Sequence, residues 1–193
     1  MKKLLITGFE PFGGEEINPS WQSVLALPEI IGGYEIVKLC LPVVFSDAAT
    51  KVLQSATEHS PEVIVCVGQA GGRSAITPEF VGINLRHASI PDNSGNQPQD
   101  TPIVQDGATA YFSTLPVRKM VASIQDVGIP SSVSYSAGTY VCNDLLYTLL
   151  SHFDGTDTRV GFIHVPYCTE QNKSPSMSLQ DIVKGLIVAI QNI

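Results

Sequence analysis

Hydrophobic and polar positions along the chain follow two rhythms that alternate with one another. Short apolar runs that end in turn residues are typical of buried strands, whereas an apolar residue at every third or fourth position is typical of a helix with one buried face. The apolar runs predict strands over Lys3–Thr7, Tyr34–Leu41, Glu62–Val67, Phe80–Leu85, Ser132–Ser136 and Arg159–Val165. The helical rhythm predicts helices over Ser20–Leu27 (with Ser20 as its cap), Asp47–His59, Val117–Val127, Asn143–His152 and Ser178–Ile190.

The order of these elements indicates the fold class. The strand at Tyr34–Leu41, the helix at Asp47–His59 and the strand at Glu62–Val67 form a βαβ unit, which implies neighbouring parallel strands. No repeat or linker interrupts the chain, so we expect one domain over residues 1–193. The prediction is an α/β fold, with helices on both faces of a twisted, mostly parallel, mixed sheet. The segment Pro91–Gly107 is rich in Pro, Asp, Asn and Gln and predicts a long loop, a type of segment that is often functional.

Composition and charge narrow the function classes. Hydrophobic residues make up 44% of the 193 positions, enough for a well-buried core that needs neither a disulfide nor a metal. A net charge of -7, with 11 Lys and Arg in total, argues against binding to a phosphate backbone. The apolar stretch Leu4–Ile6 is too short for a signal peptide or a membrane span. We therefore expect a cytoplasmic protein that binds neither nucleic acid nor a membrane.

Four cysteines are present, and one of them is placed differently from the rest. None of Cys40, Cys66, Cys142 and Cys168 forms a Cys-x-x-Cys pair, so we expect free thiols rather than a zinc or redox site. Cys40 and Cys66 lie in apolar strand-like runs, where a cysteine is usually a small core residue. Cys142 directly precedes the helix predicted at Asn143–His152, where the helix dipole lowers a thiol pKa. From the pattern alone, Cys142 is either a nucleophile or a buried structural cysteine.

A thiolate nucleophile needs a base that later protonates the leaving group. The chain offers His59, His87, His152 and His164. His59 and His152 are expected to be solvated at helix ends, and His87 begins the middle of the chain without a clear role. His164 ends the strand predicted at Arg159–Val165, and the carboxyl end of such a strand is where α/β proteins place their sites. His164 is thus the best-placed base, with a purely structural histidine as the alternative.

Other residues suggest an orienting acid and a pocket. Glu79 is a candidate for the third group that orients the imidazole, against the alternative of a solvated surface carboxylate. Two glycine-rich segments, Gly8–Gly14 and Gly68–Arg73, lack the spacing of phosphate or dinucleotide sites. Phe9 and Phe12 in the first segment either pack on the core edge or line a pocket for a small, flat, mostly apolar ligand.

Several long motifs occur in order along almost the whole chain. They are Thr7–Gly14 (TGFEPFGG) with Asn18–Trp21 (NPSW), Gly68–Arg73 (GQAGGR) with Ile76–Glu79 (ITPE), Ile90–Asn93 (IPDN) with Gly95–Pro98 (GNQP), Ala137–Asn143 (AGTYVCN) and Gly161–Tyr167 (GFIHVPY). Together they resemble the motifs of the pyrrolidone-carboxylate peptidases, the pyroglutamyl peptidase I family of cysteine peptidases.

The resemblance implies an activity and a catalytic triad. It implies hydrolysis of the bond after an N-terminal pyroglutamyl residue of a peptide, through an acyl-enzyme on Cys142, with His164 and Glu79 completing the triad. It also implies an α/β/α sandwich, no metal or cofactor, and assembly into a homo-oligomer, a homotetramer in many relatives.

The same resemblance implies which residues bind the substrate. The pocket positions of the family fall on Phe9, Phe12, Gln69, Ile90, Tyr140 and Val141. Tyr140 stands where we expect Phe in relatives, and Val43 where we expect Thr in some of them, so the pocket edge differs. Donors for the oxyanion are expected from the Cys142 N–H and from Arg73 or nearby backbone.

Two other function classes stay open at this stage. The first is a catalytically silent module that binds a small molecule on the same fold. The second is a phosphorylase-like enzyme on a related α/β fold, which would need a phosphate site with more Arg and Lys than this chain contains. Release of a chromophore from a pyroglutamyl amide separates both from the peptidase.

Overall fold

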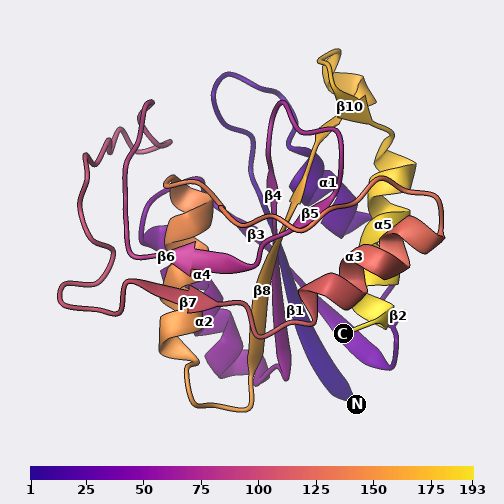
Figure 1. Cartoon of the computed structure of the whole chain (residues 1–193), viewed down its shortest axis with the longest axis horizontal. Helices are drawn as coiled ribbons and strands as arrows, with labels where there is room; N and C mark the ends of the chain where they lie inside the picture. The colour runs from indigo at the N-terminus through magenta and orange to yellow at the C-terminus, as the bar shows by residue number, and fades with distance from the viewer.

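Six strands form the central sheet of the computed structural model, which describes residues 1–193 (Figure 1). In order across the sheet they are β2 (Ile30–Ile31), β3 (Tyr34–Leu41), β1 (Lys2–Phe9), β4 (Val63–Gln69), β8 (Arg159–Val165) and β5 (Thr77–Pro78). The four central strands are parallel to one another, and the short edge strands β2 and β5 run antiparallel to their neighbours. The predicted mixed, mostly parallel sheet is confirmed.

Five helices cover the two faces of this sheet (Figure 1). One face carries α1 (Pro19–Leu25), α3 (Val117–Asp126) and α5 (Leu179–Gln191), and the other carries α2 (Asp47–His59) and α4 (Val141–His152). Alternate strand residues serve alternate faces: Leu4 and Ile6 pack in the first layer, and Leu5 packs in the second. None of the helices has both the length and the apolar character that crossing a bilayer demands. The predicted α/β/α sandwich is confirmed.

The helices begin near the predicted residues, with one correction at α1. The cap of α1 is Asn18, whose side chain accepts a hydrogen bond from the Ser20 N–H at 3.0 Å, while Pro19 occupies the first helical position. Ser20 was predicted as the cap, but it lies inside the first turn, where its hydroxyl donates to Asn18 Oδ1 at 2.7 Å. An Asn-Pro pair is thus the stronger start signal here.

Smaller elements lie outside the main sheet. β6 (Val81–Ile83) and β7 (Ala110–Phe112) form one antiparallel pair, and β9 (Tyr167–Cys168) and β10 (Ser176–Met177) form a parallel pair after β8, separated by a 3₁₀ turn at Thr169–Gln171. The strand predicted at Phe80–Leu85 is therefore shortened to β6.

The strand predicted at Ser132–Ser136 is wrong. This segment runs beside β5 but makes only isolated bridges, from Ser131 to Ile76 and from Ser134 to Glu79. Between these two bridges stands Pro78, which has no N–H to donate and so interrupts the ladder. The segment is consequently an irregular strip of backbone held against the edge of the sheet, next to Glu79.

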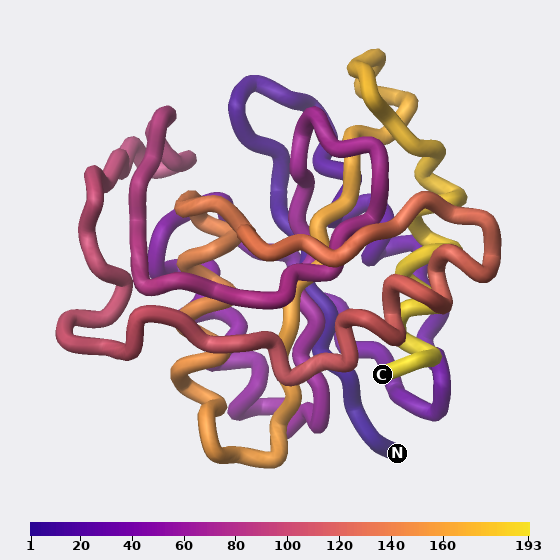
Figure 2. Tube along the Cα trace, viewed as in Figure 1, coloured from indigo at the N-terminus to yellow at the C-terminus, as the bar shows by residue number.

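The middle of the chain, Pro91–Gly107, contains no helix or strand, as predicted for a long loop. In Figure 2 this segment arches along one side of the molecule, far from the chain termini. The buried carboxylate of Asp92 anchors its start, because it accepts hydrogen bonds from the N–H groups of Phe45 at 3.0 Å and Asn96 at 2.8 Å. The loop is thereby tied to the chain just before α2.

All four cysteines are free thiols, but they differ in burial. Cys66 in β4 and Cys168 in β9 are buried, whereas Cys40 in β3 is partly exposed. The expectation of a core position is therefore confirmed for Cys66 and wrong for Cys40, which lies near the carboxyl end of β3, where the strand is only partly covered.

Candidate active site

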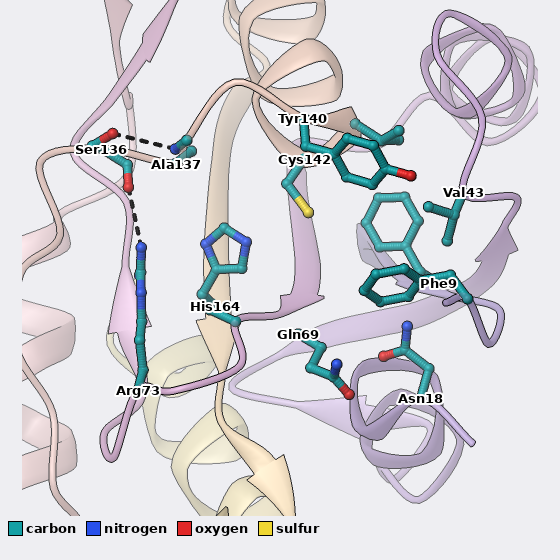
Figure 3. A pocket seen from close by; sticks show the side chains of 14 residues that line it. Phe9, Asn18, Val43, Gln69, Arg73, Ser136, Ala137, Tyr140, Cys142 and His164 are labelled. Carbon is teal, nitrogen blue, oxygen red and sulfur yellow. Dashed lines mark hydrogen bonds between the residues drawn. The ribbon is translucent and has the colours of Figure 1, made fainter. Parts of the chain in front are cut away.

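A cavity of about 500 Å³ opens where three parallel strands end beside the start of α4 (Figure 3). Phe9 ends β1, Gln69 ends β4, and His164 is the next-to-last residue of β8. Cys142 enters the cavity from α4, so sequence-distant residues meet at the edge where α/β sheets place their sites. The lining residues are Phe9, Phe12, Asn18, Val43, Gln69, Ala70, Arg73, Ser136, Ala137, Gly138, Tyr140, Val141, Cys142 and His164.

Cys142 is the second residue of α4, whose first turn leaves backbone donors unused. The Asp144 N–H is the first to bond back, to the Tyr140 carbonyl at 3.1 Å, and the Tyr140 side chain does not cap the helix. The N–H groups of Val141, Cys142 and Asn143 are therefore available to a negative charge that develops beside the thiol.

The surroundings of Cys142 favour the protonated thiol over the thiolate. Burial raises the pKa of this thiol to about 12, and the negative charge of Glu79 acts in the same direction. These two effects act against the lowering of the pKa that is expected from the start of a helix. A neighbouring base must therefore remove the proton when the sulfur attacks.

His164 and Glu79 form a buried hydrogen-bonded pair. His164 Nδ1 lies 2.6 Å from Glu79 Oε1, and Glu79 is fully buried. Burial opposes ionisation of Glu79, but the hydrogen bonds and positive charge around it outweigh burial and lower the pKa of the carboxyl. Glu79 is thus an acceptor for the Nδ1–H, which leaves Nε2 of His164 without a proton. Burial also lowers the pKa of His164, so the ring is neutral at pH 7.

The imidazole and the thiol are neighbours. Figure 3 shows the ring of His164 beside the Cys142 sulfur, with Arg73 on the far side of the ring. Gly68 on β4 pairs with His164 on β8, and a Cβ at Gly68 would lie 2.9 Å from Cys142 Sγ and 2.7 Å from the Phe162 ring. The absence of a side chain at Gly68 therefore makes room for the sulfur next to His164.

Gly68→Ala is expected to lower kcat/KM for the amide substrate that the motif resemblance implies by about tenfold to about 100-fold, because the added methyl group displaces the thiol. The control is Gly185→Ala in α5, on the other face of the sheet, where the obstructing atom is Cδ1 of Ile76. That variant is expected to change the melting temperature but not kcat/KM. Equal kcat/KM values for Gly68→Ala and the wild type would show that the thiol does not need this space.

One half of the cavity is aromatic and contains no carboxylate. The rings of Phe12 and Tyr140 lie 6.4 Å apart, and Phe9 is buried at the base of the wall. The hydroxyl of Tyr140 donates to the Pro91 carbonyl at 3.0 Å, so the long loop holds this ring in place. No Asp or Glu side chain is among the lining residues, and Arg73 is the one Lys or Arg among them.

Gln69 lies across from the aromatic rings (Figure 3). Its Oε1 accepts a hydrogen bond from Gln171 Nε2 at 2.9 Å, and the same nitrogen donates to Glu15 at 3.2 Å. The amide of Gln69 is therefore fixed by the turn that follows β9. Val141 is buried in the α4 packing, so its backbone rather than its side chain is the part available to a ligand.

Ile90 does not line the cavity, although it was predicted to do so. Its side chain is 47% exposed, and the carbonyl of the next residue, Pro91, instead reaches Tyr140. Val43 lines the cavity, in agreement with its expected place at the pocket edge. The sequence-based prediction missed three lining segments, which are Asn18, Ala70 and Ser136–Gly138. The Asn-Pro helix start marks Asn18, whereas the others enter through loops whose path depends on the assembled fold.

Arg73 lies in the cavity wall, but its guanidinium is already engaged. Nη1 donates to Glu79 Oε1 at 2.8 Å and to the Thr77 hydroxyl at 2.6 Å, and Nη2 donates to the Ser136 carbonyl at 3.1 Å. These bonds leave the Cys142 N–H as the better-placed of the two predicted oxyanion donors.

Comparison with known proteins gives the same family from sequence and from structure. The family model described as Pyroglutamyl peptidase matches residues 2–193. A pyrrolidone-carboxylate peptidase from Lactobacillus helveticus is 50% identical over 194 residues, which cover 98% of this chain and 97% of that protein. The crystal structure of Bacillus amyloliquefaciens pyroglutamyl peptidase I superposes with a TM-score of 0.96 at 46% identity, covering 100% of this chain and 96% of that one. A pyrrolidone carboxyl peptidase from Thermococcus litoralis gives a TM-score of 0.95 at 39% identity, covering 99% and 92%.

Proposed function

The chain belongs to the pyroglutamyl peptidase family, and from this membership we propose that Cys142, His164 and Glu79 are its catalytic triad. As a member of that family it is a cysteine peptidase that removes an N-terminal pyroglutamyl residue. The observation that carries the assignment of residues is the 2.6 Å hydrogen bond between Glu79 and His164 beside the Cys142 thiol.

Acylation begins from a neutral thiol and a neutral imidazole. His164 Nε2 takes the proton of Cys142 as the sulfur attacks the scissile carbonyl, and Glu79 stabilises the imidazolium that forms. The carbonyl oxygen becomes an oxyanion at the start of α4, where the Cys142 N–H donates a hydrogen bond to it and stabilises its charge. His164 then gives its proton to the departing amine, and a thioester on Cys142 remains.

Deacylation repeats these steps with water. His164 takes a proton from a water molecule as the water oxygen attacks the thioester carbonyl. The second oxyanion forms in the same place, the C–S bond breaks, and the proton returns to the Cys142 sulfur. Pyroglutamate leaves, and the resting pair of neutral groups is restored.

The aromatic half of the cavity suits the pyroglutamyl ring. This ring is a small, uncharged lactam, and the faces of Phe9 and Phe12 offer it apolar contact. Its N–H and C=O need partners once they are buried, and Gln69 and Val141, whose backbone groups are the proposed partners, line the same cavity.

The leaving peptide occupies the opposite half. His164 must reach the departing amine, and on the His164 side of the cavity Figure 3 shows Arg73, Ser136 and Ala137. Ala137 is buried, yet its backbone N–H and C=O make no hydrogen bond within the protein. Unpaired backbone groups of this kind are free to bind the main chain of the leaving peptide.

A direct test is release of a chromophore from a pyroglutamyl amide, with and without iodoacetamide. We expect release by the untreated protein and its loss after alkylation. No release would contradict the peptidase assignment. A phosphorylase gains no support from the cavity, because it needs free cations for phosphate and the one arginine there is bound to Glu79. A catalytically silent binding module is separated by the assay itself, since it would release no chromophore.

Three further properties are part of this proposal. Residues 1–193 form one domain, which is supported by the two core layers that share a single sheet. A cytoplasmic location is supported by the four free thiols. Self-association, with a homotetramer as the proposed assembly, is supported by an exposed aromatic patch, since Phe112 and Tyr135 both pack on Phe80 at 5.5 and 5.6 Å while remaining 68% and 59% exposed. Sedimentation equilibrium gives the mass of the assembly.

Glu79→Gln is expected to lower kcat by at least about tenfold and to move the acid limb of kcat/KM to lower pH. The base must be neutral, and burial already places the pKa of His164 below its ordinary 6.5. The Glu79 anion partly counteracts burial, so its removal lowers the pKa of the ring further while the imidazolium in the transition state loses its stabilising charge.

The measurement is kcat/KM from about pH 4 to about pH 9 for both proteins. Glu62→Gln is the matched control, because Glu62 pairs with Lys2 at the amino ends of β4 and β1, away from the cavity, and it is expected to leave the profile unchanged. An unchanged kcat in Glu79→Gln, or an acid limb that moves upward, would remove Glu79 from the triad.

A further inference from the structure

Arg73 makes contacts that neither the triad chemistry nor lactam binding requires. Its Nη1 donates to Glu79 Oε1 at 2.8 Å, the oxygen that also accepts from His164 Nδ1 at 2.6 Å. Its Nη2 donates to the Ser136 carbonyl at 3.1 Å, in the wall that faces the leaving peptide. We propose that Arg73 is a positioning residue that locks the Glu79 carboxylate against His164 and ties the leaving-group wall Ser136–Gly138 to the triad. This proposal rests on the proposed function and assigns Arg73 no contact with the reacting atoms.

The Glu79 carboxylate needs such a lock. It is fully buried, and both of its close hydrogen bonds fall on Oε1, while Oε2 has no hydrogen-bond partner. The Ser134 side chain also lowers the pKa of this carboxyl, but only His164 and Arg73 hold it within hydrogen-bond geometry, both through Oε1. Without Arg73, the carboxylate would be free to turn about its last torsion and exchange its two oxygens. The guanidinium prevents this, because it fixes Oε1 in place and supplies the opposite charge that a buried anion requires.

The second nitrogen of the Arg73 guanidinium, Nη2, holds the loop before α4 in place. The Ser136 carbonyl accepts from Arg73, and the Ser136 hydroxyl accepts from the Gly138 N–H at 3.2 Å (Figure 3). Ala137 lies between these two bonds, with its own backbone groups unpaired. One side chain thus sets both the orientation of the general base and the place where the leaving peptide rests.

The charge of Arg73 affects the pH dependence of kcat/KM, which a purely structural role of this residue would leave unchanged. The groups that face His164 are the Glu79 anion from the edge of β5, the Arg73 cation from the loop after β4, and the protonated Cys142 thiol of α4. Burial lowers the pKa of His164, Glu79 raises it, and Arg73 lowers it. Loss of Arg73 therefore moves the acid limb of kcat/KM upward in pH, opposite to the shift expected for Glu79→Gln.

The experiment compares Arg73→Gln and Arg73→Lys with the wild type over the same pH range, with the pyroglutamyl amide as substrate. We expect Arg73→Gln to lower kcat by about tenfold to about 100-fold, to change KM little, and to raise the acid limb. Arg73→Lys keeps the positive charge but loses the hydrogen bond to Ser136. It should therefore have the acid limb of the wild type and a kcat between those of Arg73→Gln and the wild type. The control Arg159→Gln removes an arginine at the other end of β8 and should leave both values unchanged.

Two outcomes would overturn the proposal. One is a kcat for Arg73→Gln equal to that of the wild type. The other is a lower kcat with an unmoved acid limb in both Arg73 variants, which would indicate a structural role only. Failure of the proposed function is distinguishable, because in that case the wild type itself would not release the chromophore.

Discussion

Replacing Cys142 with serine will abolish turnover of pyroglutamyl amides while the fold survives. The change exchanges sulfur for oxygen without altering the helix start, so the packing of α4 is retained. A serine hydroxyl is a much weaker nucleophile for a base arranged around a thiol, and the acyl-enzyme no longer forms. The expected loss in kcat is at least about 10⁴-fold, which is the size of loss seen when the nucleophile of a hydrolytic triad is replaced.

The other cysteines provide matched controls. Cys40→Ser lies in a partly exposed part of β3 and Cys66→Ser in the buried part of β4. Cys66→Ser should lower the melting temperature, because it places a hydroxyl in an apolar layer, and both variants should keep their activity per folded molecule. Near-native activity in Cys142→Ser would show that the nucleophile is another residue.

The second large effect concerns the N-terminal residue of the substrate. Pyroglutamyl amides should be hydrolysed with a kcat/KM at least about 10³-fold above that of glutaminyl amides. An open-chain glutamine carries a charged α-amino group, and no carboxylate lines the cavity to pair with it. Stripping water from an unpaired ammonium costs several kcal/mol, and each ~1.4 kcal/mol is about tenfold in discrimination.

Proline separates ring shape from lactam chemistry. A prolyl amide brings a similar five-membered ring, but its secondary amine is charged and it has no lactam carbonyl. The backbone groups near Gln69 and Val141 would then remain unpaired, so prolyl amides should also be rejected. The measurement is kcat/KM for matched pyroglutamyl, glutaminyl and prolyl amides, and comparable values for the three would contradict lactam recognition.

Much of the scaffold was readable from local patterns. The helix at Asp47–His59 was predicted to the residue from its apolar period, and the four parallel strands follow from apolar runs. The strand predicted at Ser132–Ser136 failed, because its partner segment contains Pro78 and the local sequence does not reveal which segments will pair. The alternation of apolar and polar residues indicates which face of a segment is buried, but it does not indicate which segment pairs with it through hydrogen bonds.

The cavity residues also divide into those that the local sequence predicts and those that depend on the assembled fold. Cys142 and His164 stood out because a helix start and a strand end are positions that single elements define. The raised pKa of the Cys142 thiol could not be predicted from the sequence, because the strands and loops that surround the sulfur are distant in sequence. For the same reason, the double contact of Arg73 with Glu79 and Ser136 is a property of the assembled fold.

The most direct measurement is to trap the acyl-enzyme. The wild type is mixed with an activated pyroglutamyl ester, quenched in acid within the first turnover, digested and mapped by mass spectrometry. The mechanism predicts one pyroglutamyl group per chain, attached to the peptide that contains Cys142, and none in Cys142→Ser. A pyroglutamyl group on any other residue, or rapid turnover by wild type with no trapped acyl group, would contradict Cys142 as the nucleophile.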